Sequence, residues 1–426
     1  MANNTTTYGL FKAYFLSISK RSLVLSSVFS AILILCFISS SQDAFFSSRQ
    51  QDYYMYARND THLLSTKSNF DCLSCDSPPV ATNQKQHSTY HYTSKQLFEA
   101  CLDRGKLAEY YMSIVLVTRN DNYGDDQLDR LQNMLDSTFM MAQDTKTRME
   151  VLIIEWNPIQ GKRSIADTYR FRRSDYLTWR IITVPPQIHD AFGYPQPKAL
   201  YEFEGKNLGI RYARGEFVVC VNQDDIWSQN MYNAIKARTW RKKMLYTQRQ
   251  GIHHASSQDS NLNDSTLVQL SPFATDQEIQ SSCNFTTDTH EPHPMQMVSL
   301  SAQNYLRIGH EASDFTLAHR DVWTAVGGYR EAGATIWMDV EFLVTAHVMG
   351  YPIVYSETPF NCHQTHARVE HEGASNDNRH VQVDHIFENK VSYSNARLGK
   401  HWGLSHIQDL YEQGLQCQVF RGGLGV

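Results

Sequence analysis

The stretch Glu216-Phe-Val-Val-Cys-Val-Asn-Gln-Asp-Asp225 decides the fold. Its first part, Phe217 to Val221, is apolar and rich in β-branched residues, which is typical of a buried strand. Polar side chains follow at once, from Asn222 to Asp225. Ligands of open α/β sheets bind at the carboxyl ends of the strands. The pattern therefore predicts a strand that delivers carboxylates to a ligand-binding edge. Such carboxylates suit a hard divalent cation and the phosphates it carries, although solvated acids at a strand end would give the same pattern.

The flanking sequence predicts an alternation of strands and helices. The segment 206–215, just before the decisive strand, has the pattern of a short amphipathic helix that ends at a glycine. Three earlier apolar runs, 112–118, 149–155 and 180–184, are each bounded by polar residues or prolines. Continuous apolar strands that alternate with helices favour an α/β fold with a mainly parallel sheet, covered by helices on both faces.

The second half of the chain continues this pattern after an interruption. Residues 251–298 are rich in Ser, Asn, Gln, Thr and His, which predicts a variable surface insertion, either a lid on the acceptor side or a segment without a role. Helices are then expected over 321–326 and from about Met338, and a strand over 352–355.

The N-terminus indicates a membrane anchor. Residues 1–21 contain Lys12, Lys20 and Arg21 and no acid, and the apolar run that follows makes 22–40 long enough to span a thin bilayer. Positive charge before the span predicts a cytoplasmic N-terminus and a luminal remainder. A cleaved signal peptide is the alternative, because serines 39–41 follow the apolar run.

The remaining organisation follows from composition. Charged residues make up 19% of the 426 residues and the net charge is -5, which favours neither a nucleic-acid binder nor a disordered acidic protein. We expect a luminal stem over 41–109, a catalytic domain over 110–410 and a C-terminal tail over 411–426. Seven of the eight cysteines lie outside the apolar run, so at least one is free or intermolecular. Cys220, inside the decisive strand, is the expected free thiol.

Taken together, the motifs of the body resemble the GT-A glycosyltransferase superfamily, in its family-2-like part. The resemblance rests on collinear short motifs at Ser113–Asp121, Glu155–Pro158, Ile181–Pro185, Lys206–Phe217, Asn222–Asp224, Asp314–Glu331, His363–His366 and Trp402–Leu404. It implies a Rossmann-like GT-A fold and a nucleotide-sugar donor. The departure lies in the D-x-D motif, where Asn222 takes the place of the first acid.

The resemblance also implies a metal site and a nucleotide site. Asp224 is the expected first metal ligand, with Asp225 as the alternative; His363 adds an imidazole, with His366 in reserve. Carboxylates with an imidazole suit Mn²⁺ as well as Mg²⁺. Contacts to the nucleotide-sugar are expected from Thr118, Arg119, Asp121, Glu155, Asn207, Asn222 and Asp314.

A general base is expected at the start of the helix near Met338. Met338-Asp-Val-Glu341 matches the family's E-D-V-E position, with Met338 in place of the first acid, and Asp339 stands where the base stands. Glu341 is the second candidate. An acidic residue in the first turn of a helix is also favoured by the helix dipole alone.

With this resemblance, these features predict a type II protein of the Golgi or ER membrane that transfers a sugar to a glycan or glycoprotein, with a uridine diphosphate sugar as the expected donor. Inversion is expected, and a retaining transfer is the alternative within this enzyme class. The other classes are a decayed GT-A fold that binds carbohydrate or acts as a scaffold, and a hydrolase of nucleotide-sugars or phosphate esters. Asn222 and Met338, in place of family acids, favour the decayed fold.

The predicted topology can be tested in microsomes. Glycosidase treatment should lower the apparent mass if Asn59, Asn263 or Asn284, the three sequons, carries glycan. Protease added to intact vesicles should leave residues 41–426 undigested, and digestion of the body would contradict a luminal domain.

Overall fold

The computed structural model describes residues 94–249, 267–272, 274–284, 292–309, 312, 314–333, 337–366, 379–389 and 393–421. The predicted cytoplasmic tail and anchor, most of the predicted stem, Asn59 and Asn263 lie outside these residues. Among the helices that are described, none combines the length and the hydropathy needed to cross a membrane.

The described helices are α2 (Ser94–Leu102), α3 (Gln127–Thr145), α4 (Ile165–Thr168), α5 (Pro186–Asp190), α6 (Glu202–Tyr212), α7 (Gln229–Lys236), α8 (Asp276–Ser282), α9 (Tyr305–Gly309), α10 (Arg320–Val326), α11 (Met338–Val348) and α12 (Arg379–Asn389). The described strands are β1 (Tyr110–Thr118), β2 (Met149–Trp156), β3 (Leu177–Val184), β4 (Gly215–Cys220), β5 (Asp225–Trp227), β6 (Leu245–Gln248), β7 (Leu267–Val268), β8 (Met295–Val298), β9 (Thr316–His319), β10 (Ile353–Ser356), β11 (Asn361–Gln364) and β12 (Gln416–Phe420).

The described strands form a nine-stranded sheet in the order β12-β3-β2-β1-β4-β9-β6-β10-β8 and a three-stranded sheet in the order β5-β11-β7. In the large sheet, β3, β2, β1, β4, β6 and β10 run in one direction, while β12, β9 and β8 are reversed. The expected α/β fold with a mainly parallel sheet is confirmed. The reversed strands were not predicted, because a short apolar strand has the same pattern in either direction.

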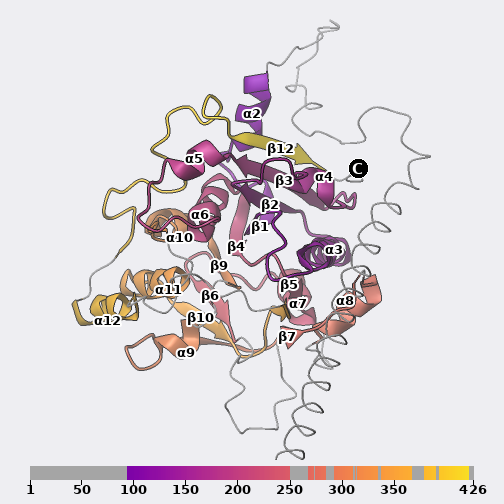
Figure 1. Ribbon diagram of the computed structural model, residues 1–426. Helices are drawn as coiled ribbons and strands as arrows, with labels where there is room; N and C mark the ends of the chain where they lie inside the picture. The colour runs from indigo at the N-terminus through magenta and orange to yellow at the C-terminus, as the bar shows by residue number, and fades with distance from the viewer. Residues whose placement is uncertain are drawn as a thin grey trace, which may run out of the picture. The chain divides into compact units, whose positions relative to one another are not determined.

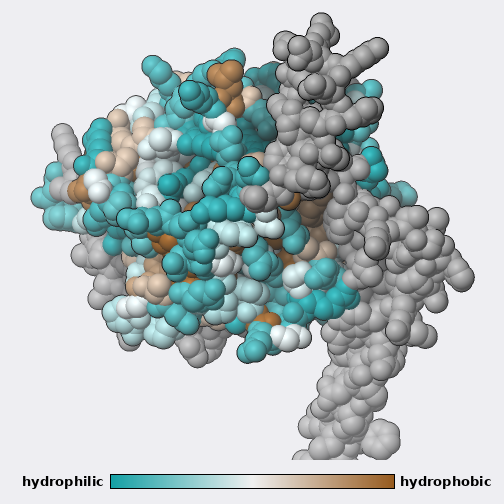
Figure 2. All heavy atoms as spheres, turned by 90° about the horizontal axis from the view of Figure 1, so that it is seen from above, coloured by the Kyte–Doolittle hydropathy of each residue, from teal (hydrophilic) through white to brown (hydrophobic). Residues whose placement is uncertain are grey.

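Helices cover both faces of the large sheet (Figure 1). On β1, Val115 and Val117 join the core that α6, α10 and α11 complete, while Ile114 and Leu116 join the core on the side of α3 and α7. This alternation follows from the two-residue period of a strand. The outer surface is mainly hydrophilic, with scattered apolar side chains on the face in Figure 2.

A buried polar cluster links the end of helix α2 and strand β12 to the amino-terminal side of the sheet. The Arg180 guanidinium lies 3.3 Å from the Glu150 carboxylate, and both side chains are fully buried. Arg180 also donates to the main-chain oxygen of Cys101, at 3.1 Å, and Cys101 forms a disulfide with Cys417. Residues 416–420, within the predicted C-terminal tail, therefore form β12 and extend the sheet beyond residue 410. Helix α2, within the predicted stem, is fixed by the same disulfide.

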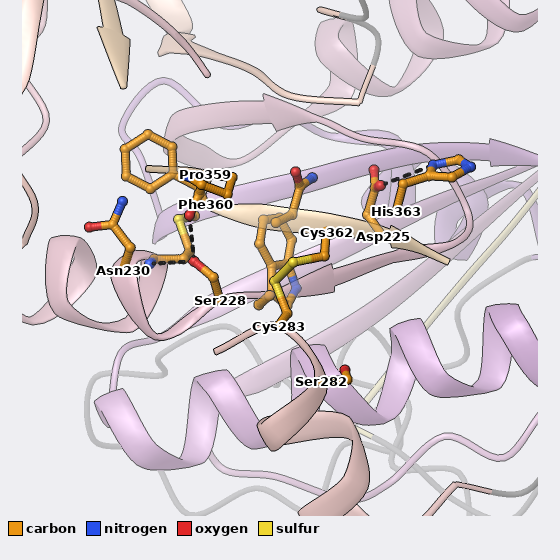
Figure 3. The surroundings of a disulfide bond; sticks show 12 residues. Asp225, Ser228, Asn230, Ser282, Cys283, Pro359, Phe360, Cys362 and His363 are labelled. Atoms are coloured by element: carbon orange, nitrogen blue, oxygen red, sulfur yellow. Dashed lines mark hydrogen bonds and ion pairs between the residues drawn. A yellow bond between two sulfur atoms is a disulfide. The ribbon is translucent and has the colours of Figure 1, made fainter. Parts of the chain in front are cut away.

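A second disulfide joins the predicted insertion to the rest of the fold. Parts of 251–298 form β7, α8 and β8, and Cys283, which follows α8, is bonded to Cys362 on β11 (Figure 3). Asn284, beside this disulfide, is exposed. Among the described cysteines Cys220 is free and buried, as predicted.

Helix α6 differs from the predicted helix over 206–215, because it begins at Glu202 and ends at Tyr212. Gly215 does not cap it but opens β4, where a Cβ atom would lie 2.4 Å from the Ser113 nitrogen. Two other glycines let α6 lie close to β1. A Cβ at Gly209 would lie 2.4 Å from Val115 Cγ1, and one at Gly205 would lie 2.7 Å from Val117 Cγ1.

The close approach of α6 to β1 predicts a coupled pair of substitutions. Alanine normally stabilises a helix over glycine by about 1 kcal/mol, but Gly209→Ala should instead lower the free energy of unfolding by about 1–3 kcal/mol, the usual cost of overpacking. Combining it with Val115→Ala makes room for the new methyl group. Denaturant unfolding of both single variants and the double variant should show that the double variant loses less than the sum, and additive losses would contradict the contact.

Candidate functional site

The site forms where the carboxyl ends of the parallel strands meet. Strands β1, β2 and β4 end at the same edge of the sheet, because β1 pairs in parallel with both neighbours. The chain leaves β4 through Asn222 to Asp224 and enters β5, whose antiparallel pairing with β11 sets His363 opposite Asp225. The decisive stretch of the sequence and the C-terminal histidines are thereby brought together.

Three carboxylates surround the His363 imidazole. Its Nδ1 atom lies 3.6 Å from Asp224 Oδ1, 3.6 Å from Asp225 Oδ1 and 3.5 Å from Asp314 Oδ2. His366 Nε2 lies 3.6 Å from Asp224 Oδ2. The dashed line in Figure 3 marks the contact between Asp225 and His363. Three carboxylates and two imidazoles therefore converge at one point of the sheet edge.

These residues fit a divalent cation. Two overlapping sets have ligand atoms within 4.8 Å of one another: Asp224, His363 and His366, and Asp225, Asp314 and His363. Oxygen and imidazole donors suit Mn²⁺ and Mg²⁺. The Oδ1 atom of Asp225 is buried and accepts no hydrogen bond of normal length, which a cation would remedy.

Electrostatics in the cluster also favour a cation. Burial raises the pKa of Asp225 well above its usual range, and the Asp314 carboxylate raises it further. For His363, burial lowers the pKa, but the carboxylates of Asp224, Asp225 and Asp314 outweigh this and raise it well above its usual value. Positive charge is therefore stabilised at the position of this imidazole.

Asp224 is already paired with a buried cation. The Arg130 guanidinium, on α3, forms an ion pair with Asp224 in which both side chains are buried. It also donates to the main-chain oxygens of Tyr123 and, at 3.0 Å, of Asp125. Gln364 donates to the main-chain oxygens of Arg130 at 2.9 Å and Asp224 at 3.1 Å. Helix α3, the loop after β1 and β11 thus hold Asp224 in place.

Asn222 connects two of the carboxylates. Its main-chain N–H donates to Asp225 Oδ2 at 2.8 Å, and its side-chain amide donates to Asp314. Its own Oδ1 accepts from Lys206 Nζ at 3.0 Å, and Lys206 is fully buried and also pairs with Glu202 at 2.7 Å. The predicted contact residues Asn222 and Asp314 are therefore bonded to each other.

The predicted nucleotide loop is held by its own polar network. Thr118 donates to Gln223, and Gln127 donates to Gln223 at 2.7 Å and accepts from the Asn122 N–H at 2.6 Å. Arg119 donates to the main-chain oxygen of Asn157 at 2.7 Å and lies 3.7 Å from Asp121.

The side chains of Glu155 and Asn207 are hydrogen-bonded to residues outside the predicted nucleotide loop. The Glu155 carboxylate accepts from the Ile165 N–H at 2.9 Å and from Thr183 at 2.8 Å. The Asn207 amide donates to the Tyr329 oxygen at 2.8 Å and accepts from the Tyr329 N–H at 2.7 Å. Both residues position neighbouring loops in this structure.

The loop that leads to the predicted base is anchored on α6. Asn207 also donates to the Glu331 carboxylate at 3.0 Å, and Glu331 accepts from the Gly403 N–H at 2.7 Å. The Glu204 carboxylate accepts from the N–H groups of Ala332 at 3.1 Å and Gly333 at 2.8 Å. Helix α6 thereby sets the path of the chain that reaches α11.

The two predicted catalytic acids lie in different surroundings. Asp339 is buried in the first turn of α11, after Trp337 with its left-handed φ of 71°. Burial raises the pKa of Tyr329 well above its usual value, and the Cys220 thiol and the Asp339 carboxylate raise it further. Glu341 instead forms a two-fold ion pair with Arg330, at 2.6 and 2.5 Å.

Sequence reasoning missed four residues of this site: Arg130, Gln127, Lys206 and Gln364. Lys206 lay inside a quoted motif, and its position at a helical spacing of four from Glu202 could have indicated the pair. The contacts that bring the other three into the site join residues far apart in the chain, Gln127 to Gln223 and both Arg130 and Gln364 to Asp224, so they carried no local signal.

Comparisons with known proteins give only a distant likeness. No protein-family model matches the chain, and no curated protein matches it. Among solved structures, TarS of S. aureus is similar at a TM-score of 0.35 and 12% identity, over 60% of this chain and 36% of that chain. Its fragment 1–349 gives a TM-score of 0.37 and 13% identity, over 71% of this chain and 76% of that chain. The same fragment in complex with UDP-GlcNAc gives 0.36 and 12%. The function is therefore argued from the site alone.

The buried Glu331 predicts a pH dependence of stability. Burial raises its pKa to about 7 from an ordinary value of 4.5, so the folded state holds the proton more tightly than the unfolded state. The resulting stability is complete below pH about 4.5 and is lost as the pH rises through about 7. Glu331→Gln keeps an oxygen for Asn207 and Gly403 but does not titrate. Its stability relative to wild type should rise by up to about 1.4 kcal/mol per pH unit in this window.

Denaturant unfolding between pH 4 and 8 would measure this difference. A Glu331→Gln curve that runs parallel to wild type would mean that the carboxyl group does not titrate in this range.

Proposed function

We propose that this chain is a glycosyltransferase that moves a sugar from a nucleotide-sugar, most simply a uridine diphosphate sugar, to a glycan or glycoconjugate acceptor. One observation carries the proposal. Three buried carboxylates and two imidazoles converge at the carboxyl edge of a mainly parallel sheet, beside a polar loop after β1. Such an arrangement offers a cation site and a nucleotide site at one edge, and the buried Asp339 in the first turn of α11 is the candidate proton acceptor.

The leaving group sets the chemical requirement. A nucleoside diphosphate leaves with its negative charge increased, and that charge must be stabilised in the transition state. A bound Mn²⁺ or Mg²⁺ would supply this stabilisation as a Lewis acid. Within the chain, the ligands would come from two overlapping sets that share His363: Asp224 with His366, and Asp225 with Asp314.

Roles for the other predicted residues follow from their positions. Thr118 ends β1, and Arg119 and Asp121 lie on the loop that follows, where the base and ribose would bind. Glu155 would support this region, and Asn207 the region of Asp339, through the loops they hold rather than by direct contact. Asp314 lies in the cation cluster and Asn222 is bonded to it, from where they would face the donor sugar.

Asp339 is the proposed general base. The acceptor hydroxyl gives its proton to the Asp339 carboxylate while its oxygen bonds to the anomeric carbon, and the bond from that carbon to the diphosphate oxygen breaks with its electron pair. This is a single displacement with inversion. Glu341 is held by Arg330, which supports a positioning role for it.

A donor screen tests the proposed function. The full-length chain is incubated with Mn²⁺ and a panel of nucleotide-sugars, with and without acceptor glycans, and released nucleotide is measured. Release that depends on acceptor supports transfer. Release without acceptor would indicate a hydrolase, and binding of sugar without release would indicate a non-catalytic carbohydrate-binding protein.

The proposed base predicts a kinetic separation of two variants. Asp339→Asn keeps the size of the side chain but cannot take a proton, so transfer should fall by about 10²- to 10⁴-fold, while donor affinity stays near that of wild type. Glu341→Gln should transfer at nearly normal rate but melt at a lower temperature, because it weakens a buried ion pair. If Glu341→Gln loses transfer and Asp339→Asn only melts at a lower temperature, the base is Glu341. Full activity of both variants would favour a retaining mechanism.

A further inference from the structure

Two alternative ligand sets for the cation share His363. One set uses Asp224 and His366, and the other uses Asp225 and Asp314. The family pattern points to Asp224, the last acid of the motif Asn222–Asp224. The contacts of the individual carboxylate oxygens distinguish between the two sets.

The surroundings of Asp224 disfavour it as a ligand. Its Oδ2 atom is bound to Arg130 Nη1, and the two side chains are only 2% and 6% exposed. A divalent cation on the same carboxylate would lie close to the guanidinium and be repelled by it.

All three carboxylates have one oxygen near His363 Nδ1, but Asp225 and Asp314 differ from Asp224 in that neutral amide groups, and not a guanidinium, hold their other oxygen. Each has one oxygen bonded to Asn222: Asp225 Oδ2 accepts from the main-chain N–H, and Asp314 Oδ1 accepts from the side-chain amide. The second oxygen of each points toward His363 Nδ1, at 3.6 and 3.5 Å. The Oδ1 atom of Asp225, in a side chain that is 0% exposed, accepts no hydrogen bond of normal length.

Asn222 suits this arrangement better than an acid would. An amide can donate to Asp314 while it accepts from Lys206, at 3.0 Å. An ionised aspartate at this position has no donor and would repel the Asp314 carboxylate. Residues that orient metal ligands in this way usually change metal affinity by about 10- to 100-fold when they are removed.

The charges of the cluster agree with one divalent cation. Asp224, Asp225 and Asp314 contribute three negative charges when ionised, and Arg130 compensates one of them. Lys206 and Glu202 compensate each other. Two negative charges remain for the ion, on the two carboxylates that Asn222 orients.

We infer that Asp225, Asp314 and His363 bind the divalent cation, that Asn222 positions the two carboxylates, and that Arg130 keeps Asp224 outside the coordination shell. The inference rests on the proposed function, since it names the ligands of the same site. Arg130 becomes a fixed counter-charge that links the loop after β1 to the cation site.

Binding of Mn²⁺ alone tests this assignment in the full-length chain. Free Mn²⁺ is measured by electron paramagnetic resonance during titration of wild type and of the variants. Asp225→Asn and Asp314→Asn should lower the affinity by at least about 100-fold, and Asn222→Ala by about 10- to 100-fold. His366→Ala is the matched control and should stay within about threefold of wild type, because it loses no ligand. Asp224→Asn leaves an oxygen for Arg130 but removes its counter-charge, so it should lose affinity through charge alone, and clearly less than Asp314→Asn.

Two outcomes would overturn the inference: a loss in Asp224→Asn as large as that in Asp314→Asn, or wild-type affinity in both Asp314→Asn and Asn222→Ala. Thermal melting without Mn²⁺ identifies a variant that fails to fold, and Asn222→Ala then decides, because it retains every ligand. Failure of the proposed function is distinguishable. Mn²⁺ binding with the expected pattern but no nucleotide release would overturn only the function, and transfer that is unaffected by chelator would overturn only the cation site.

Discussion

Three carboxylates buried around one imidazole are the constraint on which the rest of this structure depends. Asp224, Asp225 and Asp314 lie within 3.6 Å of His363 Nδ1, and buried like charges are costly unless they are paired or bind a cation. The Arg130 guanidinium forms an ion pair with Asp224. Asn222 donates hydrogen bonds to the other two acids, Asp225 and Asp314. The electrostatics of the site therefore explain why α3 and the loop after β4 have their particular polar residues.

Helix α6 connects the cation cluster to the loop at Tyr329, which leads to Asp339. Its glycines let it lie against β1, so that Lys206 reaches Asn222 in one direction and Asn207 reaches the loop at Tyr329 in the other. Because the close packing and the polar contacts belong to the same short helix, a shift of its axis would move both the cation cluster and the approach to Asp339. We regard α6 as the element that fixes the position of the cation cluster relative to the loop that leads to Asp339.

Disulfides complete the site from segments that are remote in the chain. The Cys283–Cys362 bond fixes the strand that holds His363 to the end of α8, although the two cysteines are 79 residues apart. The Cys101–Cys417 bond closes 316 residues and secures β12 and α2 at the opposite end of the sheet. Cross-links of this kind restrict the unfolded chain most when the loop is long.

The sequence by itself determined the strands around the site, because continuous apolar runs such as 112–118 and 217–221 identify buried strands, and it identified the acids that follow β4. It also located His363 and Asp339 as candidates. Only the tertiary structure decided which oxygen faces which partner. Arg130 and Asp224, or Cys283 and Cys362, meet through folding of distant segments, and no local pattern records such a contact. The reversed strands and the commitment of Asn207 to Tyr329 were hidden for the same reason: they depend on neighbours in space, while periodicity and spacing report only neighbours in the chain.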